Sequence, residues 1–281
     1  MSDLTWTETQ LRRLKELDLD LKNIPAHFST PAERNTLFQQ IEKKQTKDQR
    51  AKLSDYLSQG NPSHMDSLME TVCQVLYKQG FIRVSTPTII TRSALVKMTI
   101  DEDHPLTRQV YWLNEKQCLR PMLAPNLYSL MKDFARLNLR PIRFFEMGSC
   151  FRKESDGARH NSEFTMLNLV EMGLALEHRH SRLMELASMV AEASGLTDFR
   201  FETEESKVYG STLDVVAGPD SIEVASGAMG PHPLDAAWNI TDTWVGMGFG
   251  LERLLMTSSQ DTTIGKWGKS LSYLNGIRLS L

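Results

Sequence analysis

A strongly charged segment flanked by two apolar segments, within residues 142–169, constrains the fold of this chain more than any other feature. The apolar flanks predict two β-strands, and the charged centre around Asp156 and Gly157 predicts the loop that joins them. Guanidinium groups bind phosphate oxygens through paired N–H groups, and aromatic faces can stack on bases, so a hairpin of this kind suits a polyanion. Taken alone, residues 150–164 fit a plain solvated turn equally well.

The bulk properties exclude several classes of protein. The 281 residues can bury one large core, or a large domain and a small appendage. Lys and Arg number 32 and Asp and Glu 35, for a net charge of −3, so nucleic-acid contacts must come from local patches. The sequence has no apolar run of membrane-spanning length, so no membrane partner is expected. The three cysteines are scattered, which argues against a disulfide framework or a structural zinc site and favours a reducing, cytoplasmic location.

The first sixty residues predict a small helical region. Apolar residues recur at helical spacing within residues 5–22, and Pro31 suits the first turn of a second helix that runs to about Leu57. The lysines of this second helix form either a solvated face or, in the sharper interpretation, a face that contacts RNA phosphates. Gly60 and Pro62 then break the chain, so we expect one region over 1–60 and a second over 61–281.

The second region mixes strands with helices. The patterns predict helices over 62–78, around 122–131 and over 181–194. They predict strands over residues 81–87, 110–113, 118–121, 199–203, 212–216 and 221–225. Ala124, Leu127, Tyr128 and Met131 share one helical face, which periodicity alone assigns to the core.

Near the end of the chain, glycines 246, 248 and 250 precede a predicted helix. Glycine lets a ligand come close to the backbone, and a helix N-terminus favours anions. Arg253 stands in the first turn, where a cation opposes the helix dipole, so this arginine has another purpose. The segment lacks the P-loop pattern, and no dinucleotide-binding βαβ unit is evident.

Three segments, in this order, resemble the signature motifs of the class II aminoacyl-tRNA synthetases. Residues 80–87 resemble the helix and strand that a proline closes at the dimer interface, residues 151–164 resemble the FRxE…HxxxF hairpin, and residues 248–253 resemble the GxGxER helix. Further segments resemble the pyrrolysyl-tRNA synthetase family in particular: residues 119–128, 152–157, 163–168, Trp244 and 272–276. The resemblance covers the chain from about residue 62 and implies an α+β fold, with a mostly antiparallel sheet flanked by helices. Residues 1–60 do not resemble the separate RNA-binding domain of many family members.

The resemblance implies ATP-dependent aminoacylation of tRNA, through an aminoacyl-adenylate, with pyrrolysine or a related Nε-acyl lysine. The implied partners are ATP, Mg²⁺, the amino acid, a tRNA of the pyrrolysine suppressor type and a second copy of the chain in a homodimer. The activation step needs positioned charges more than a side-chain nucleophile.

The resemblance also assigns roles to residues. Arg152 and Arg253 would be catalytic and would hold the α- and γ-phosphates of ATP. The other residues implied to lie at ATP are Glu154 at the adenine edge, Phe164 stacked on the adenine ring, and His160, Glu163, Glu223 and Gly250. Glu223 and Ser226 would bind Mg²⁺, which prefers hard oxygen donors.

In the family, the helical stripe at 124–131 lines an apolar pocket for a long acylated lysine. The implied pocket comprises Ala124, Leu127, Tyr128, Met131, Asn168, Val170, Tyr209 and Trp244. Asn168 would contact the side-chain carbonyl of the substrate, and Tyr209 would act as a lid. No acid at the matched positions could pair an ammonium group, which favours a neutral amide side chain.

The chain departs from the commoner family pattern at Asn161 and Ser162, which bears on ATP affinity and loop motion. Three alternatives compete: a phenylalanyl-type synthetase, a synthetase-like paralogue without tRNA charging, and a generic α/β binding protein. Asn168 and the 272–276 segment argue against the first, the intact charged residues argue against the second, and the three ordered motifs argue against the third.

Overall fold

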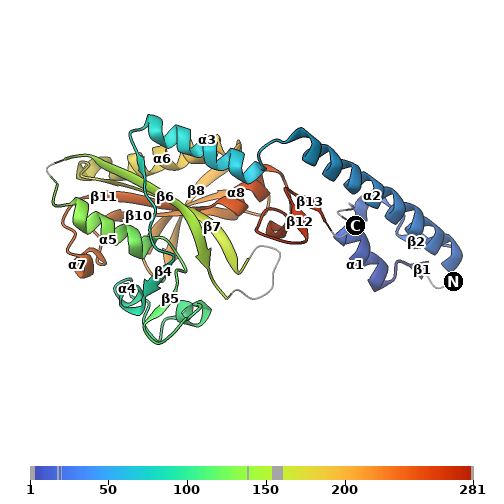
Figure 1. The fold of residues 1–281 in the computed structure, drawn as a ribbon, viewed down its shortest axis with the longest axis horizontal. Coiled ribbons are helices and arrows are strands. Elements are labelled where there is room, and N and C mark those ends of the chain that lie inside the picture. The colour runs from blue at the N-terminus through green and yellow to red at the C-terminus, as the bar shows by residue number, and fades with distance from the viewer. Residues whose placement is uncertain (1–3, 18, 20, 138, 154–160, 280–281) are drawn as a thin grey trace. The chain divides into compact units, whose positions relative to one another are not determined.

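The computed structural model describes residues 4–17, 19, 21–137, 139–153 and 161–279. The chain forms two compact units, which we call the N-terminal unit (Met1–Pro62 with Ser270–Leu281) and the central unit (Ser63–Lys269) (Figure 1). Within the described ranges, no helix combines the length and the apolar character needed to cross a bilayer.

A seven-stranded sheet forms the middle of the central unit (Figure 1), in the order β3-β6-β7-β11-β10-β9-β8. Its strands are β3 (Ile82–Arg83), β6 (Ile142–Phe151), β7 (Glu163–Met172), β8 (Phe199–Ser206), β9 (Gly210–Ala217), β10 (Ile222–Gly230) and β11 (Trp244–Gly250). Neighbouring strands are antiparallel except β3, which pairs with β6 in parallel. The predicted α+β fold with a mostly antiparallel sheet is confirmed.

The two faces of the sheet bury different sets of side chains, because side chains alternate along a strand. On β7, Leu167 and Leu169 pack into the cluster formed with three helices, α3 (His64–Lys78), α6 (Arg179–Ala193) and α8 (Leu251–Ser258). On the other face, Val170 and Trp244 pack with the helices α4 (Arg92–Val96), α5 (Ala124–Phe134) and α7 (Asp235–Trp238) and with the ribbon of β4 (Ile89–Thr91) and β5 (Gln117–Leu119). Each fully buried leucine or valine stabilises the fold by about 1.5–3 kcal/mol relative to an exposed one.

Local sequence signals set the helix boundaries. The Ser63 hydroxyl accepts a hydrogen bond from the Asp66 backbone N–H and caps α3. Thr30 caps α2 (Pro31–Gln59) in the same way, with Pro31 in the first turn, and Gly60 ends this helix in the left-handed conformation at φ 64°.

Two sequence predictions were wrong in extent, and one predicted strand was not found in the described structure. The strand predicted over 81–87 is only β3, because Thr86 gives its backbone N–H to the Glu146 carboxylate (3.1 Å) instead of a neighbouring strand. The strand predicted over 110–113 is absent from the described structure: a 3₁₀ helix, Pro105–Gln109, precedes it, and Trp112 makes one isolated bridge to Cys118. The helix predicted within 5–22 is α1 (Glu8–Glu16), followed by a 3₁₀ turn, Leu21–Asn23.

The N-terminal unit has a small core of its own around Trp6, Leu14 and Phe28. It holds α1, α2 and two short ribbons: β1 (Leu4–Thr5) with β2 (His27–Phe28), and β12 (Tyr273–Leu274) with β13 (Ile277–Arg278). Arg278 bonds the Glu16 carbonyl (2.9 Å) and the Gln49 side chain (3.4 Å). Residues 270–281 therefore pack with the N-terminal unit, whereas the sequence division at residue 60 had placed them in the second region.

Candidate active site

A cavity of about 470 Å³ lies on the α5 side of the central sheet. All eight residues of the predicted amino-acid pocket line it: Ala124, Leu127, Tyr128, Met131, Asn168, Val170, Tyr209 and Trp244. Six residues predicted to bind ATP or metal line the same cavity: Arg152, Phe164, Glu223, Ser226, Gly250 and Arg253. The structure thus brings together side chains from seven separate stretches of sequence.

The register of three strands lays the cavity out from a charged end to an apolar end. β11 lies between β7 and β10, and its glycines pair with residues of both neighbours. The pairs run Gly250 with Met166, Gly248 with Asn168 and Ser226, Gly246 with Val170 and Ala228, and Trp244 with Met172 and Gly230. Arg253 and Glu223 stand near the first of these levels and Trp244 near the last, so one cavity offers two chemical environments.

Two glycines of β11 keep the cavity open. A Cβ on Gly248 would lie 3.0 Å from Oδ1 and 3.1 Å from Nδ2 of Asn168, and one on Gly246 would lie 3.3 Å from the Leu169 carbonyl oxygen. Contacts this short would force Asn168 to shift. Gly248 therefore leaves the room in which the Asn168 amide lies.

At the charged end, the Arg152 guanidinium is held by a main-chain acceptor and an aromatic face. Its Nε donates to the Pro121 carbonyl at 2.9 Å, and its Cζ lies 5.3 Å from the centre of the Phe164 ring. A cation over an aromatic face is attracted by about 0.5–2 kcal/mol. These contacts fix the direction in which the guanidinium enters the cavity.

Arg253, in the first turn of α8, lies beside Glu223. Its Nη1 donates to the Glu223 carbonyl at 3.0 Å and stands 3.6 Å from Oε1 of the same residue. Burial raises the pKa of the Glu223 carboxyl, and the nearby Arg253 charge opposes this shift. Gly250, Glu252 and Arg253 all line the cavity, so the N-terminus of α8, which has no side-chain cap, lies at this end.

The fit to Mg²⁺ is partial. Glu223 and Ser226 offer a carboxylate and a hydroxyl, which are donors of the right kind, and the Ser226 hydroxyl donates to Asp214 at 2.6 Å. Among the residues with described positions, no group of three or more acids, histidines or cysteines is arranged to hold a metal. These residues suit an ion that arrives with a nucleotide and keeps phosphate or water ligands.

Aromatic packing builds the apolar end. The Tyr128 ring stacks on Trp238 and meets Trp244 edge-on, both with centres 5.6 Å apart. The Trp244 indole N–H donates to the Asp235 carboxylate at 3.0 Å. Burial raises the pKa of Tyr128 and of Tyr209, so both phenols are neutral at physiological pH.

Asn168 stands between the two ends. Its Oδ1 atom is buried and has no hydrogen-bond partner in the described structure. An unpaired buried polar atom costs about 1–3 kcal/mol, so this amide is suited to a polar group of a ligand.

Tyr209 lies in the tight turn between β8 and β9. Its carbonyl is 2.8 Å from Nε2 of His232, and the two rings meet edge-on at 5.6 Å. His232 therefore secures the turn that carries the predicted lid residue.

Of the predicted ATP residues with described positions, Glu163 is not brought to the cavity. Its carboxylate pairs with Lys269, whose Nζ also lies 2.6 Å from the Ser149 hydroxyl. The hydrogen bond from Lys269 is the main cause of the lowered pKa of Glu163. Glu154 and His160 lie outside the described residues, and their roles stay predictions.

The cavity also contains residues that sequence reasoning did not assign to it. Glu252 is 1% exposed and accepts hydrogen bonds from the Thr165 backbone N–H at 2.8 and 3.0 Å, and burial raises its pKa. The imidazole Nε2 of His104 and the Nδ2 of Asn161 are buried without partners in the described part of the chain. Glu252 belongs to the glycine-rich motif and could have been found there, whereas His104 carries no periodic or motif signal.

The comparisons agree with this geometry. The family model "tRNA synthetases class II core domain (F)" matches residues 48–266. A crystal structure of pyrrolysyl-tRNA synthetase from Desulfitobacterium hafniense is 50% identical, covers 100% of both chains and superposes with a TM-score of 0.91. The chain belongs to the class II aminoacyl-tRNA synthetases, in the pyrrolysyl-tRNA synthetase family. The predicted family is confirmed.

A second structure of a pyrrolysyl-tRNA synthetase from D. hafniense matches at 48% identity and a TM-score of 0.88, over 99% of this chain and 96% of that one. The lysine–tRNA ligase of Saccharolobus solfataricus is 33% identical over 105 residues, which is 37% of this chain and 19% of that protein. The match to that ligase thus spans only about a fifth of its length.

Proposed function

We propose that this synthetase activates pyrrolysine or a related Nε-acyl lysine with ATP and transfers it to tRNA. One observation carries the proposal: a single cavity joins an arginine-bearing end to an apolar end, and between them lies Oδ1 of Asn168, which has no partner among the described residues. The similarity over the whole chain to pyrrolysyl-tRNA synthetase supports the same activity.

In the activation step, the amino-acid carboxylate attacks the α-phosphorus of ATP and pyrophosphate leaves. Negative charge on the phosphate oxygens is met by Arg152 and Arg253, whose contacts to main-chain carbonyls hold them in place before ATP binds. Mg²⁺ carried by the nucleotide, with Glu223 and Ser226 as protein ligands, would supply further charge neutralisation. Phe164, already under the Arg152 guanidinium, offers a face to the adenine ring.

The apolar end accounts for the side-chain preference. Its lining is aromatic and aliphatic, and among the described residues the lining carboxylates, Glu223 and Glu252, are at the charged end beside Arg253. Asp235 lies behind Trp244, does not line the cavity and is already bonded by the Trp244 indole N–H. A lysine ammonium in the apolar end would therefore remain unpaired, whereas a neutral amide could bond Asn168.

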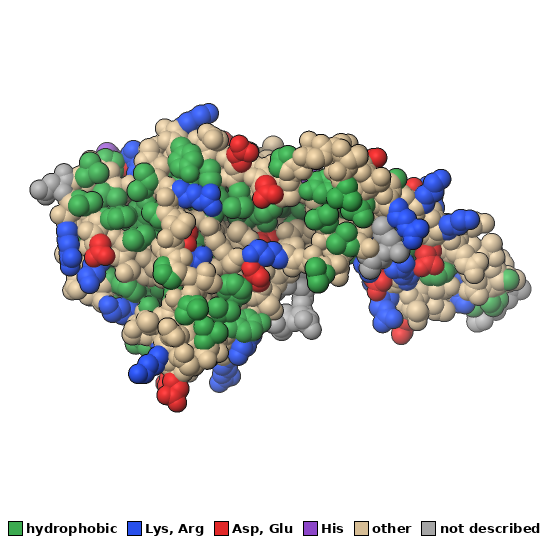
Figure 2. All heavy atoms as spheres, viewed as in Figure 1, with side chains coloured by type: hydrophobic (Ala, Val, Ile, Leu, Met, Phe, Trp, Pro, Cys, Tyr) green, Lys and Arg blue, Asp and Glu red, His purple; other side chains and the backbone are tan. Residues whose placement is uncertain are grey.

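The proposal includes tRNA and a second copy of the chain as partners, in the cytoplasm. Lys43, Lys44 and Lys47 are exposed on α2 and could contact phosphates. Figure 2 shows basic and acidic side chains interspersed over the face in view, so any such contact is local. Exposed Ile82 (56%), within the first signature motif, and Ile89 (49%), just after it, suit a dimer contact.

Amino-acid-dependent ATP–pyrophosphate exchange tests the activity. We expect exchange with pyrrolysine and Nε-acyl lysines, and none with lysine or phenylalanine. Exchange with phenylalanine only would favour the phenylalanyl-type alternative, and exchange with none of the acyl lysines would contradict the proposal. A paralogue without tRNA charging would show exchange but no aminoacylation of a pyrrolysine suppressor tRNA.

A further inference from the structure

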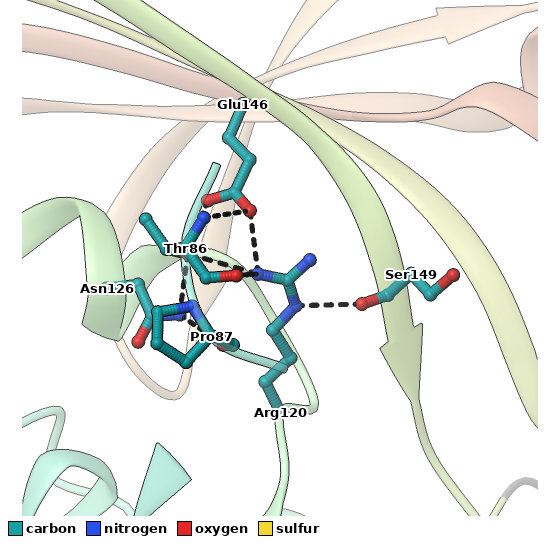
Figure 3. Close-up of polar contacts among 6 residues, drawn as sticks. All are labelled: Thr86, Pro87, Arg120, Asn126, Glu146 and Ser149. Carbon is teal, nitrogen blue, oxygen red and sulfur yellow. Dashed lines mark hydrogen bonds and ion pairs between the residues drawn. The ribbon is translucent and has the colours of Figure 1, made fainter. Parts of the chain in front are cut away.

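We propose that Arg120 is a positioning residue that, together with Glu146, anchors both ends of the cavity at once (Figure 3). This inference rests on the proposed function and adds to it a residue outside the three signature motifs. Neither Arg120 nor Glu146 lines the cavity, so any effect on activity must pass through the residues that they hold.

The anchor is a buried ion pair. Arg120 is 3% exposed and Glu146 2% exposed, and Nη1 of the arginine lies 2.7 Å from Oε1 of the glutamate. The same guanidinium donates through Nε to the Ser149 carbonyl (2.8 Å) and through Nη1 to the Thr86 hydroxyl (3.1 Å). Figure 3 shows the guanidinium between the two segments that these acceptors occupy, the β6 strand and the chain before Pro87.

One line of contacts leads from Arg120 to the charged end. The Phe151 backbone N–H donates to the Arg120 carbonyl at 2.9 Å, and the next carbonyl, that of Pro121, accepts from Nε of Arg152 at 2.9 Å. The Arg120 side chain also donates a hydrogen bond to the Ser149 carbonyl in β6, so the Pro121 carbonyl is held beside the end of this strand. The direction of the Arg152 guanidinium follows from that place.

A second line leads to the apolar end. The Thr86 hydroxyl donates to Oε2 of Glu146 (2.6 Å) and accepts from the Asn126 side chain (2.7 Å), which also donates to the Pro87 carbonyl (2.8 Å). Asn126 is in the first turn of α5, between Ala124 and Leu127, which line the cavity. The start of the pocket helix is thereby tied to the same ion pair.

The absence of a side chain at Gly148 of β6 leaves room for the Arg120 guanidinium. A Cβ on Gly148 would lie 2.1 Å from Nη2 of Arg120, a distance that no side chain could tolerate. Glycine at this point of β6, with ordinary negative φ, is explained by the arginine and not by the backbone conformation.

The contribution of a buried ion pair to the stability of the fold is too small to explain the presence of Arg120 and Glu146. Replacing a buried ion pair by apolar residues of similar volume is often neutral or stabilising, whereas removing one partner is strongly destabilising. If Arg120 and Glu146 position the cavity residues, replacing both together should keep most of the stability but not the wild-type activity.

The test compares the wild type, Arg120→Met, Arg120→Lys and the double variant Arg120→Met/Glu146→Met in pyrophosphate exchange and thermal unfolding. We expect the double variant to melt closer to the wild type than Arg120→Met does, yet to show a KM for ATP and for the amino acid raised about 10- to 100-fold. Arg120→Lys keeps the charge but cannot reach Ser149, Thr86 and Glu146 together, so it should fold and show the same rise.

Arg182→Lys is the matched control. Arg182, in α6, pairs at 2.9 Å with the buried Glu171 of the same sheet, and in the described part of the chain its bonds lead neither to Arg152 nor to α5. Both KM values should therefore stay at the wild-type level. Wild-type KM values in a folded Arg120→Lys or double variant would overturn the inference and leave the proposed function intact. Absence of exchange in the wild-type protein would instead count against the proposed function.

Discussion

The charged and apolar ends of the cavity are built by different means. At the charged end, Arg152 and Arg253 come from separate elements, and each gives one N–H to a main-chain carbonyl. At the apolar end, one helix supplies four of the lining side chains, and Tyr128 of this helix packs against the rings of Trp238 and Trp244. The hydrogen bonds fix the direction of the two guanidinium groups, whereas the packing sets the volume that is open to the amino-acid side chain. Substitutions at the charged end should therefore affect all amino acids equally, and those at the apolar end should change which amino acid is preferred.

The largest effect is expected for Arg253→Ala. Removal of a preorganised charge that faces a developing phosphate charge costs about 3–4 kcal/mol, or 10²- to 10³-fold in rate. Exchange should fall by at least this factor with every amino acid that the wild type accepts. Arg136→Ala, which removes a 72% exposed guanidinium outside the cavity, serves as the control. A loss confined to one amino acid would break the distinction between the two ends.

Asn168→Ala comes next. The amide loses its contact with the substrate, so exchange with Nε-acyl lysines should fall about 10- to 100-fold, the equivalent of roughly 1–3 kcal/mol. Thermal unfolding should show no loss of stability, because Oδ1 has no partner in the described structure. A marked drop in melting temperature together with unchanged exchange would show that Asn168 is a structural residue.

Val170→Ala should change preference rather than rate. The side chain is 5% exposed and lines the apolar end, so its truncation adds room for about two methyl groups. Each methylene of a ligand in an apolar pocket changes binding by about 1–3 kcal/mol, so the ratio of kcat/KM should move toward bulkier acyl groups. The KM for ATP should stay constant, and a change in it would contradict the separation of the two ends.

The smallest effect concerns the two cysteines, Cys118 and Cys150, that are buried in the core on the α5 side of the sheet. Burial raises the pKa of the Cys118 thiol to about 11 and that of Cys150 to about 12. Thiolates are the reactive form, so iodoacetamide at pH 8 should leave both unmodified in the native protein and alkylate them after denaturation, as measured by mass spectrometry. Alkylation of Cys150 alone would indicate that the β6–β7 pair, which leads to Arg152, opens more readily than the β4–β5 ribbon that holds Cys118.

Much of the fold could be predicted because its signals are local. Ser63 and Thr30 mark helix starts, and the alternation around Leu167 and Leu169 marks a strand with one face in each layer. The stripe through Leu127 and Tyr128 was readable as a buried face, but periodicity could not distinguish a core from a pocket wall, since both exclude water. Only the resemblance to known synthetases indicated that this helical face contacts a substrate.

The remaining features depend on contacts between distant residues. Glu163 turned toward Lys269, 106 residues later, instead of the cavity, and no pattern near Glu163 indicates this partner. Arg120 and Glu146 are both charged and both buried, the opposite of what composition suggests for such residues. Their pairing depends on the sheet register and on Gly148, which could be known only from the fold.

The ribbon of β12 and β13 completes a unit that begins at the other end of the chain. Arg278 bonds the Glu16 carbonyl across 262 residues of sequence. During synthesis, α1 and α2 leave the ribosome early, but the ribbon that packs with them is made only after the whole central unit. A premature stop shortly before residue 270 would therefore leave the central unit's sequence complete, while the N-terminal unit, although made first, would lack part of its structure.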